Sequence, residues 1–148
     1  MAFSAERGGY LVSEERGRLD EKLVCDYLRG SYWASEVPRE GILRSIRNSH
    51  AFGLYGARGQ VGFARAVTDY ARFAYLADVF VLDGHRGRGL GRWLVRCVLD
   101  HPELRGVRRW MLATRDAHGL YRPFGFAPPD EPARLMQRSF RGSSEGGA

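Results

Sequence analysis

The chain has 148 residues, of which 44% are hydrophobic and 27% are charged. These values are typical of one globular domain with its own core, and no apolar run approaches the roughly 20 residues of a membrane-spanning helix. Residues 1–10 lack the basic and apolar regions of a secretory signal, so we expect a cytoplasmic protein that does not act at a membrane.

The formal net charge is +6, and Lys22 is the only lysine. Such a charge suits a nucleic acid, an acidic partner or a polyanionic cofactor. The arginines are scattered along the chain rather than gathered in a run, which makes a nucleic-acid-binding module the weaker alternative. Cys25 and Cys97 fall on predicted apolar helix faces, where they would stay reduced, and two cysteines supply neither a disulfide framework nor a metal site.

The first half of the chain predicts helices followed by a run of strands. Gly30 is a plausible C-terminal stop for the first helix, and Pro38 suits the first turn of the second. The later strands are joined by short turns, so neighbours should be antiparallel. The expected elements are a flexible segment over 1–9, a strand over 10–12, helices over 19–28 and 38–48, and strands over 51–55, 60–68 and 73–82.

The second half predicts a helix between two strands that lie parallel to each other. Apolar residues recur at helical spacing from Leu90 to Val98, and the helix should stop at His101. A strand, a crossover helix and a second strand form a βαβ unit, which makes the two strands parallel. The remaining expected elements are a strand over 109–114, an edge strand over 134–140 and a flexible tail over 141–148.

A glycine-rich turn joins the strand that ends at Leu82 to the helix that follows. Its residues, Arg86 to Gly91, read R-x-x-G-x-G, with neither the G-K-[ST] of a Walker loop nor the G-x-G-x-x-G of a dinucleotide-binding turn. Glycines let the backbone approach an anion closely, and a helix N-terminus presents free N–H groups and a positive dipole. We therefore predict an anion cradle here, the alternative being a tight turn with solvated arginines.

The R-x-x-G-x-G sequence resembles the acetyl-CoA-binding motif of the GNAT N-acetyltransferase superfamily. About thirty residues later, Ala117 to Phe126 resembles the family signature in which a short helix carries a tyrosine and ends at Gly-Phe. The two motifs occur in the family's order, and the resemblance spans roughly Tyr10 to Phe140. It implies an α/β (α+β) GNAT fold: a mixed, mostly antiparallel sheet of about six to seven strands with about four helices, and splayed parallel fourth and fifth strands.

The resemblance also implies an activity. The chain would transfer an acetyl group from acetyl-CoA to a primary amine of a small molecule or peptide, by direct attack in a ternary complex and without a metal. A homodimer is compatible with this interpretation. A longer acyl-CoA as donor is a close variant, and a CoA-binding module without transferase activity is the alternative of another class.

By resemblance, Tyr121 is the expected general acid near the CoA sulfur; the alternative is packing against Phe124 and Phe126. Asp78 is the expected general base, and the alternative is an ion pair with an arginine. His118 is a second candidate base in the acceptor region, although a surface histidine is the more common reading.

The remaining expected site residues bind cofactor or acceptor. Backbone groups of Val79, Phe80 and Val81 would pair with the pantetheine arm. The phosphates would lie on the turn formed by Arg86, Gly87, Arg88, Gly89, Leu90, Gly91 and Arg92. Tyr32 and Trp33, between the first two helices, could line the acceptor pocket or belong to the core.

Overall fold

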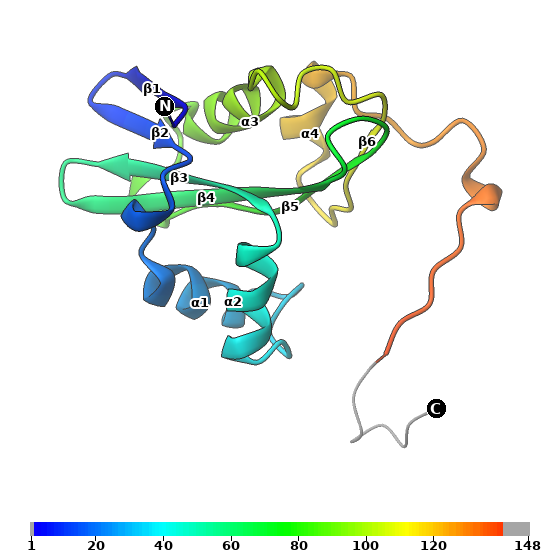
Figure 1. The fold of residues 1–148 in the computed structure, drawn as a ribbon, viewed down its shortest axis with the longest axis horizontal. Helices are drawn as coiled ribbons and strands as arrows, with labels where there is room; N and C mark the ends of the chain where they lie inside the picture. Colours follow the sequence, from blue (N-terminus) through cyan, green and yellow to red (C-terminus); the bar gives the residue numbers. More distant parts are fainter. Residues whose placement is uncertain (1, 141–148) are drawn as a thin grey trace.

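The computed structural model describes residues 2–140 as a mixed α/β fold in which one sheet is covered by helices on both faces (Figure 1). The elements in chain order are β1 (Ser4–Arg7), β2 (Tyr10–Ser13), η1 (Arg16–Arg18), α1 (Glu21–Arg29), α2 (Arg39–Arg47), β3 (His50–Gly56), β4 (Gly59–Thr68), β5 (Ala74–Val81), η2 (Asp83–His85), α3 (Leu90–Asp100), β6 (Trp110–Met111), α4 (His118–Tyr121), η3 (Arg122–Phe124) and η4 (Pro132–Arg134). None of the described helices is both long and apolar enough to cross a membrane.

The sheet has six strands that follow one another in chain order from β1 to β6. Every neighbouring pair is antiparallel except β5 and β6, which are parallel as the βαβ pattern predicts. The fold class expected from the sequence is therefore confirmed.

Strand β1 was not expected. Residues 1–9 were predicted to be flexible, yet Ser4–Arg7 pairs with Tyr10–Ser13. Gly8 and Gly9 form the connection with φ angles of +56° and +85°, the left-handed pair that a tight hairpin turn requires. The adjacent glycines therefore form a turn between two strands and do not belong to a flexible terminus.

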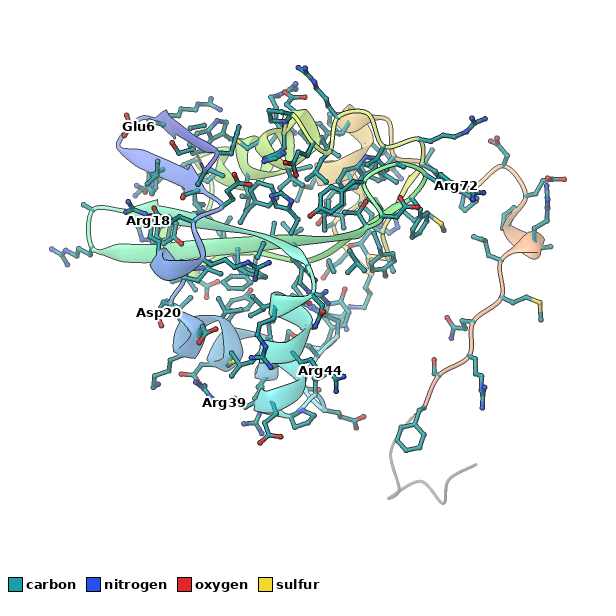
Figure 2. All side chains as sticks on the ribbon, viewed as in Figure 1. Glu6, Arg18, Asp20, Arg39, Arg44 and Arg72 are labelled. Atoms are coloured by element: carbon teal, nitrogen blue, oxygen red, sulfur yellow. The ribbon has the colours of Figure 1, made fainter. Side chains whose placement is uncertain are left out.

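Two apolar clusters lie on opposite faces of the sheet. Helices α1 and α2 pack below it in the view of Figure 1 and bury Phe63 and Phe80, whereas α3 packs above it against Phe52 and Leu54. The predicted α3 stripe is buried as expected: Leu90, Trp93, Leu94, Cys97 and Val98. Arg39 and Arg44, labelled in Figure 2, are exposed residues of α2.

The parallel pair separates soon after it begins. Strand β6 pairs with β5 only through Ala74↔Trp110 and Tyr75↔Met111, and is shorter than the predicted strand over 109–114. Further along, the pairing of β5 with β4 shifts register between Phe63 and Arg65 of β4. At this point of β5, Asp78 adopts a left-handed φ of +57°. This β-bulge turns β5 away from β6, so the edge of β5 beyond Tyr75 has no strand beside it among the described residues.

The predicted edge strand over 134–140 is wrong. Pro132–Arg134 forms a short 3₁₀ turn, and the residues after it have no regular structure. Met136 and Phe140 are 96% and 82% exposed on a segment that runs away from the domain (Figure 1). A strand needs a partner edge as well as suitable residues, and the proline-rich link before this segment leads it away from β6. The tail predicted over 141–148 lies outside the described residues.

Candidate active site

A cleft of about 1780 Å³ opens where β5 and β6 diverge. Its walls come from β5, the first turn of α3, the segment around α4 and the connection between α1 and α2. The predicted site residues along it are Tyr32, Trp33, Asp78, Val79, Phe80, Val81, Arg86, Gly87, Gly89, Leu90, Gly91, Arg92 and Tyr121. Both sequence motifs therefore contribute to the same cleft.

The glycine-rich turn is open toward an anion. Gly87 and Gly89 have φ angles of +79° and +74°, and Gly89 is the N-cap of α3. Among the described residues, no atom lies within 4 Å of the position that a Cβ would take at either glycine, and no side chain caps the helix. The first N–H groups of α3 are thus available at the cleft, next to the positive end of the helix dipole.

The Arg86 side chain contacts three protein groups next to this turn. Its Nε donates to the Val81 carbonyl at 2.8 Å, its Nη2 donates to the Tyr27 hydroxyl at 2.9 Å, and its Nη1 lies 2.7 Å from Asp83 Oδ1. Most of its donors are already used by the protein. These contacts tie the turn to the end of β5 and to α1, and the predicted role of Arg86 in cofactor binding stays a prediction.

The other two arginines of the motif differ in position. Arg88 does not line the cleft, and its Nη1 donates to the Tyr10 hydroxyl at 2.8 Å. Arg92 is exposed on the first turn of α3 and lines the cleft. Of the three arginines, Arg92 is therefore the one best placed to contact a phosphate.

Asp78 lies in the cleft, but both of its carboxylate oxygens already accept hydrogen bonds. Oδ2 accepts from Arg65 Nε at 2.6 Å, and Oδ1 accepts from the Trp33 indole N–H at 2.8 Å. The Asp78 side chain is 9% exposed and that of Arg65 is 16% exposed. The ion pair with an arginine, considered above as the alternative for Asp78, is confirmed. The role of Asp78 as a general base remains a prediction.

Tyr121, on α4, is buried at the cleft wall with 8% of its surface exposed. Burial, with a smaller contribution from Tyr32, raises the pKa of its hydroxyl to about 12, so the group stays protonated at neutral pH. Its ring packs edge-on against Phe126 with centroids 6.0 Å apart. The packing predicted as an alternative is therefore present, and it fixes the ring without using the hydroxyl.

Tyr32 and Trp33 lie on the connection between α1 and α2 and are 48% and 42% exposed. Their rings meet edge to face at 5.1 Å. The Tyr32 hydroxyl accepts the Arg115 backbone N–H at 3.1 Å, and the Arg115 guanidinium lies 3.8 Å from the ring centroid. This aromatic pair thus touches the segment after β6 as well as β5, while His118 is exposed and does not line the cleft.

Arg65 and Arg115 were missed by the sequence analysis. Arg65 carried a signal, because it shares the face of its strand with apolar Phe63 and Val67 and so needs a partner. Arg115 had no local signal. Its role depends on Tyr32, a residue 83 positions away in the chain.

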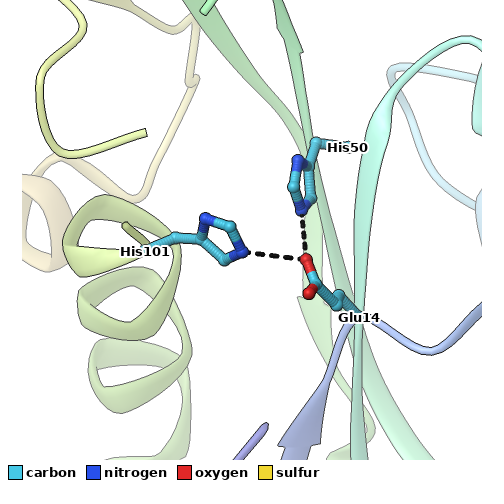
Figure 3. A group of neighbouring side chains, drawn as sticks. All are labelled: Glu14, His50 and His101. Atoms are coloured by element: carbon cyan, nitrogen blue, oxygen red, sulfur yellow. Dashed lines mark hydrogen bonds and ion pairs between the residues drawn. The ribbon is translucent and has the colours of Figure 1, made fainter. Parts of the chain in front are cut away.

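A second polar cluster lies between the sheet and the end of α3, where Glu14 Oε1 accepts from His50 Nε2 at 2.6 Å and from His101 Nε2 at 2.8 Å (Figure 3). These are metal-ligating residue types. However, His101 Nδ1 accepts the Glu103 backbone N–H at 3.0 Å, which places the ring proton on Nε2. A metal-bound histidine normally has the reverse arrangement, so the cluster fits a hydrogen-bonded carboxylate better than a metal ion.

Known proteins match this geometry and sequence. Residues 16–126 match the model of the Acetyltransferase (GNAT) family. A Gibberella zeae protein, FG08082, provisionally named an acetyltransferase, is 33% identical over 138 residues, covering 78% of this chain and 77% of its own length.

Solved structures agree. A GNAT-family crystal structure from Xanthomonas campestris pv. campestris has 45% sequence identity and a TM-score of 0.86, covering 90% of this chain and 95% of that one. A Clostridium acetobutylicum protein solved with acetyl-CoA shares the fold, with 12% identity and a TM-score of 0.63 over 88% of this chain and 94% of that one. On the family match and these relatives, the chain belongs to the GNAT acetyltransferase family.

Proposed function

We propose that this protein is an acetyl-CoA-dependent N-acetyltransferase that acts on a primary amine of a small molecule or peptide. One observation carries the proposal. The open α3 N-terminus, the free edge of β5 and the buried Tyr121 hydroxyl border one cleft, formed where β5 and β6 part.

The chain's residues fit acetyl-CoA at this site. Gly87 and Gly89 offer left-handed backbone with open space where side chains would stand, which suits a pyrophosphate. The edge of β5 from Val79 to Val81 suits the amide groups of an extended pantetheine arm, since backbone groups at a free edge seek partners. Arg92 adds a cation for a phosphate.

Acetyl-CoA would supply an activated acetyl group as a thioester. The amine nitrogen forms a C–N bond with the acetyl carbon, the C–S bond breaks, and the leaving sulfur takes a proton. The proton that the amine loses passes to solvent, and solvent returns one to the donor after each turnover. In the proposal, Tyr121 donates the proton to the sulfur from a hydroxyl that its buried setting keeps neutral. Direct attack in a ternary complex needs no covalent acyl-enzyme.

Two variants of the proposal remain. A longer acyl-CoA could serve as donor, because the cleft is large. The chain could also bind CoA without transferring an acyl group. The cytoplasmic location and the homodimer stay predictions.

The test is to incubate the purified protein with acetyl-CoA and a panel of small amines and peptides, following free thiol and confirming products by mass spectrometry. We expect thiol release that requires an amine, with N-acetylated product in equal amount. A parallel calorimetric titration with acetyl-CoA separates the alternatives. Binding with no thiol release above background across the panel favours a binding module, and absence of binding overturns the proposal.

A further inference from the structure

We propose that Asp78 and Arg65 are positioning residues that hold Trp33 as a wall of the acceptor pocket, and that Asp78 is not the proton acceptor. This inference rests on the proposed N-acetyltransferase function. It concerns the residue that the sequence alone marked as the general base.

A continuous hydrogen-bonded chain links Trp33 to the body of the fold. Trp33 donates to Asp78, Arg65 donates to the other oxygen of Asp78, and a second Arg65 nitrogen, Nη1, donates to Ser49 Oγ at 2.9 Å. Ser49 is buried and donates in turn to the Ser45 carbonyl at the end of α2 at 2.6 Å. The chain thus joins α2, β4 and β5 to the connection that carries Trp33.

The same contacts make Asp78 ill-suited to accept a proton from an amine. Each of its oxygens is engaged, one by an indole N–H and the other by a guanidinium. Arg65 is 16% exposed and has Asp78 as its counter-charge. Removing one partner of a shielded ion pair is costly, so these contacts favour a carboxylate that holds Arg65 and Trp33 in place.

The backbone at Asp78 supports a structural role. Asp78 has a φ of +57°, in the left-handed region that non-glycine residues rarely adopt. It lies at the bulge of β5, a feature that re-aims a side chain. Here the bulge aims the carboxylate between Arg65 and Trp33.

Trp33 needs such an anchor because its own segment has little regular structure. Residues 31–37 form only turns and bends between α1 and α2, and Trp33 is 42% exposed. Beside it, Tyr32 is fixed by Arg115. The two anchors hold adjacent aromatic rings over the cleft, and the rings there would contact the acceptor and limit its shape.

The first test compares Asp78→Asn and Trp33→Phe by hydrogen exchange of the whole protein. Asp78→Asn preserves size and removes the charge, whereas Trp33→Phe keeps an aromatic ring and removes only the indole N–H. Both variants should speed exchange in residues 31–37, and Asp130→Asn, an exposed aspartate outside the cleft, should not. This readout needs no turnover, so it stays informative if the proposed function fails. If hydrogen exchange in residues 31–37 is unchanged in both variants, Asp78 does not anchor Trp33 and the inference is wrong.

The second test uses kinetics with an acceptor found in the amine panel. Both variants should raise the acceptor KM by about tenfold, as expected for one lost hydrogen bond to a charged group. The pH profile of kcat should keep its shape, and acetyl-CoA affinity should stay unchanged. The double variant should be little worse than either single one, because both break the same contact. The contrary outcome is that Asp78→Asn lowers kcat by about 100-fold or more and removes a limb of the pH profile, while Trp33→Phe does neither. Asp78 would then be the base, and the inference would be wrong.

Discussion

The hydroxyl of Tyr121 is the single group on which the proposed chemistry depends most. Tyr121→Phe keeps the ring and its packing against Phe126 and removes only the proton donor. We expect kcat to fall by about 10²-fold or more, with acetyl-CoA affinity unchanged, since the sulfur needs a proton only as it leaves. Because the pKa of Tyr121 is raised to about 12, the fall should be similar from about pH 6 to about pH 9.

Tyr55 provides a matched control on β3. Burial raises the pKa of its hydroxyl to about 12 as well, but it does not line the cleft. Among the described residues its buried oxygen has no hydrogen-bond partner. Tyr55→Phe should therefore leave turnover unchanged and increase the free energy of unfolding by about 1 kcal/mol, because it removes a buried polar group that no partner satisfies. Equal loss of turnover in the two variants would show that the effect is not specific to the hydroxyl in the cleft, and would contradict the proton-donor role of Tyr121.

A glycine on β4, paired with Val81 of β5, makes a second residue-scale prediction. A Cβ at Gly62 would lie 2.8 Å from the Phe80 backbone oxygen and 3.0 Å from Leu54 Cδ2. Gly62→Ala must therefore displace β5 where the pantetheine arm is proposed to bind. We expect a loss of about 1–3 kcal/mol in the free energy of unfolding and weaker acetyl-CoA binding. Gly106→Ala, which meets no atom within 4 Å among the described residues, should change neither quantity.

Among the elements, the Glu14 cluster links the segment after β2 to the start of β3 and the end of α3 (Figure 3). Burial alone would raise the pKa of Glu14, but the Phe3 backbone N–H and the His50 and His101 imidazoles outweigh it and hold that pKa below its ordinary value of 4.5. The folded protein thus keeps Glu14 ionised where the unfolded chain would bind a proton. The resulting stability is fully present above about pH 4.5 and is lost as the pH falls through the folded pKa.

Glu14→Gln tests this link. The NH₂ group of the glutamine would point at the Phe3 N–H or at an imidazole N–H, so two donors would meet and one hydrogen bond would be lost. The free energy of unfolding at neutral pH should therefore drop by about 1–3 kcal/mol. Its dependence on pH below about 4.5 should also become flatter than in the wild type. Urea unfolding across this range measures both effects. Glu103→Gln keeps the backbone N–H that His101 accepts and should behave as the wild type. An unchanged acid slope in Glu14→Gln would show that other carboxyls set it.

Elements with strong local patterns could be predicted from the sequence. The α1, α2 and α3 helices and the parallel β5–β6 pair follow from apolar spacing and chain order. The wrong predictions concern segments whose secondary structure depends on whether a partner strand lies beside them. Ser4–Arg7 became a strand because a glycine pair folds it onto β2, and the segment over 134–140 stayed irregular because no edge of the described sheet meets it.

At the scale of the whole molecule, the two motifs predicted the cleft, but the sequence could not show how its side chains are paired. The contact of Trp33 with Asp78 joins residues 45 positions apart, and the bond between Arg88 and Tyr10 spans 78 positions. Such contacts depend on the finished sheet. They also distinguish the three arginines of the motif, because Arg86 and Arg88 bond to protein groups, whereas Arg86 and Arg92 line the cleft.

In the proposed function, acetyl-CoA binds this cleft through the glycine-rich turn at α3. Gly89→Glu places a negative side chain at the helix N-terminus, in a backbone conformation that glycine favours. Gly106→Glu adds the same charge at a position outside the cleft where a side chain meets no atom within 4 Å among the described residues. Circular dichroism should show that both variants are folded.

Calorimetric titration of acetyl-CoA into the wild type and these two variants is the most direct measurement. We predict binding by the wild type and by Gly106→Glu, and no detectable binding by folded Gly89→Glu. Undiminished affinity of Gly89→Glu for acetyl-CoA would contradict the assignment of this turn as the phosphate site, and with it the account of the cleft.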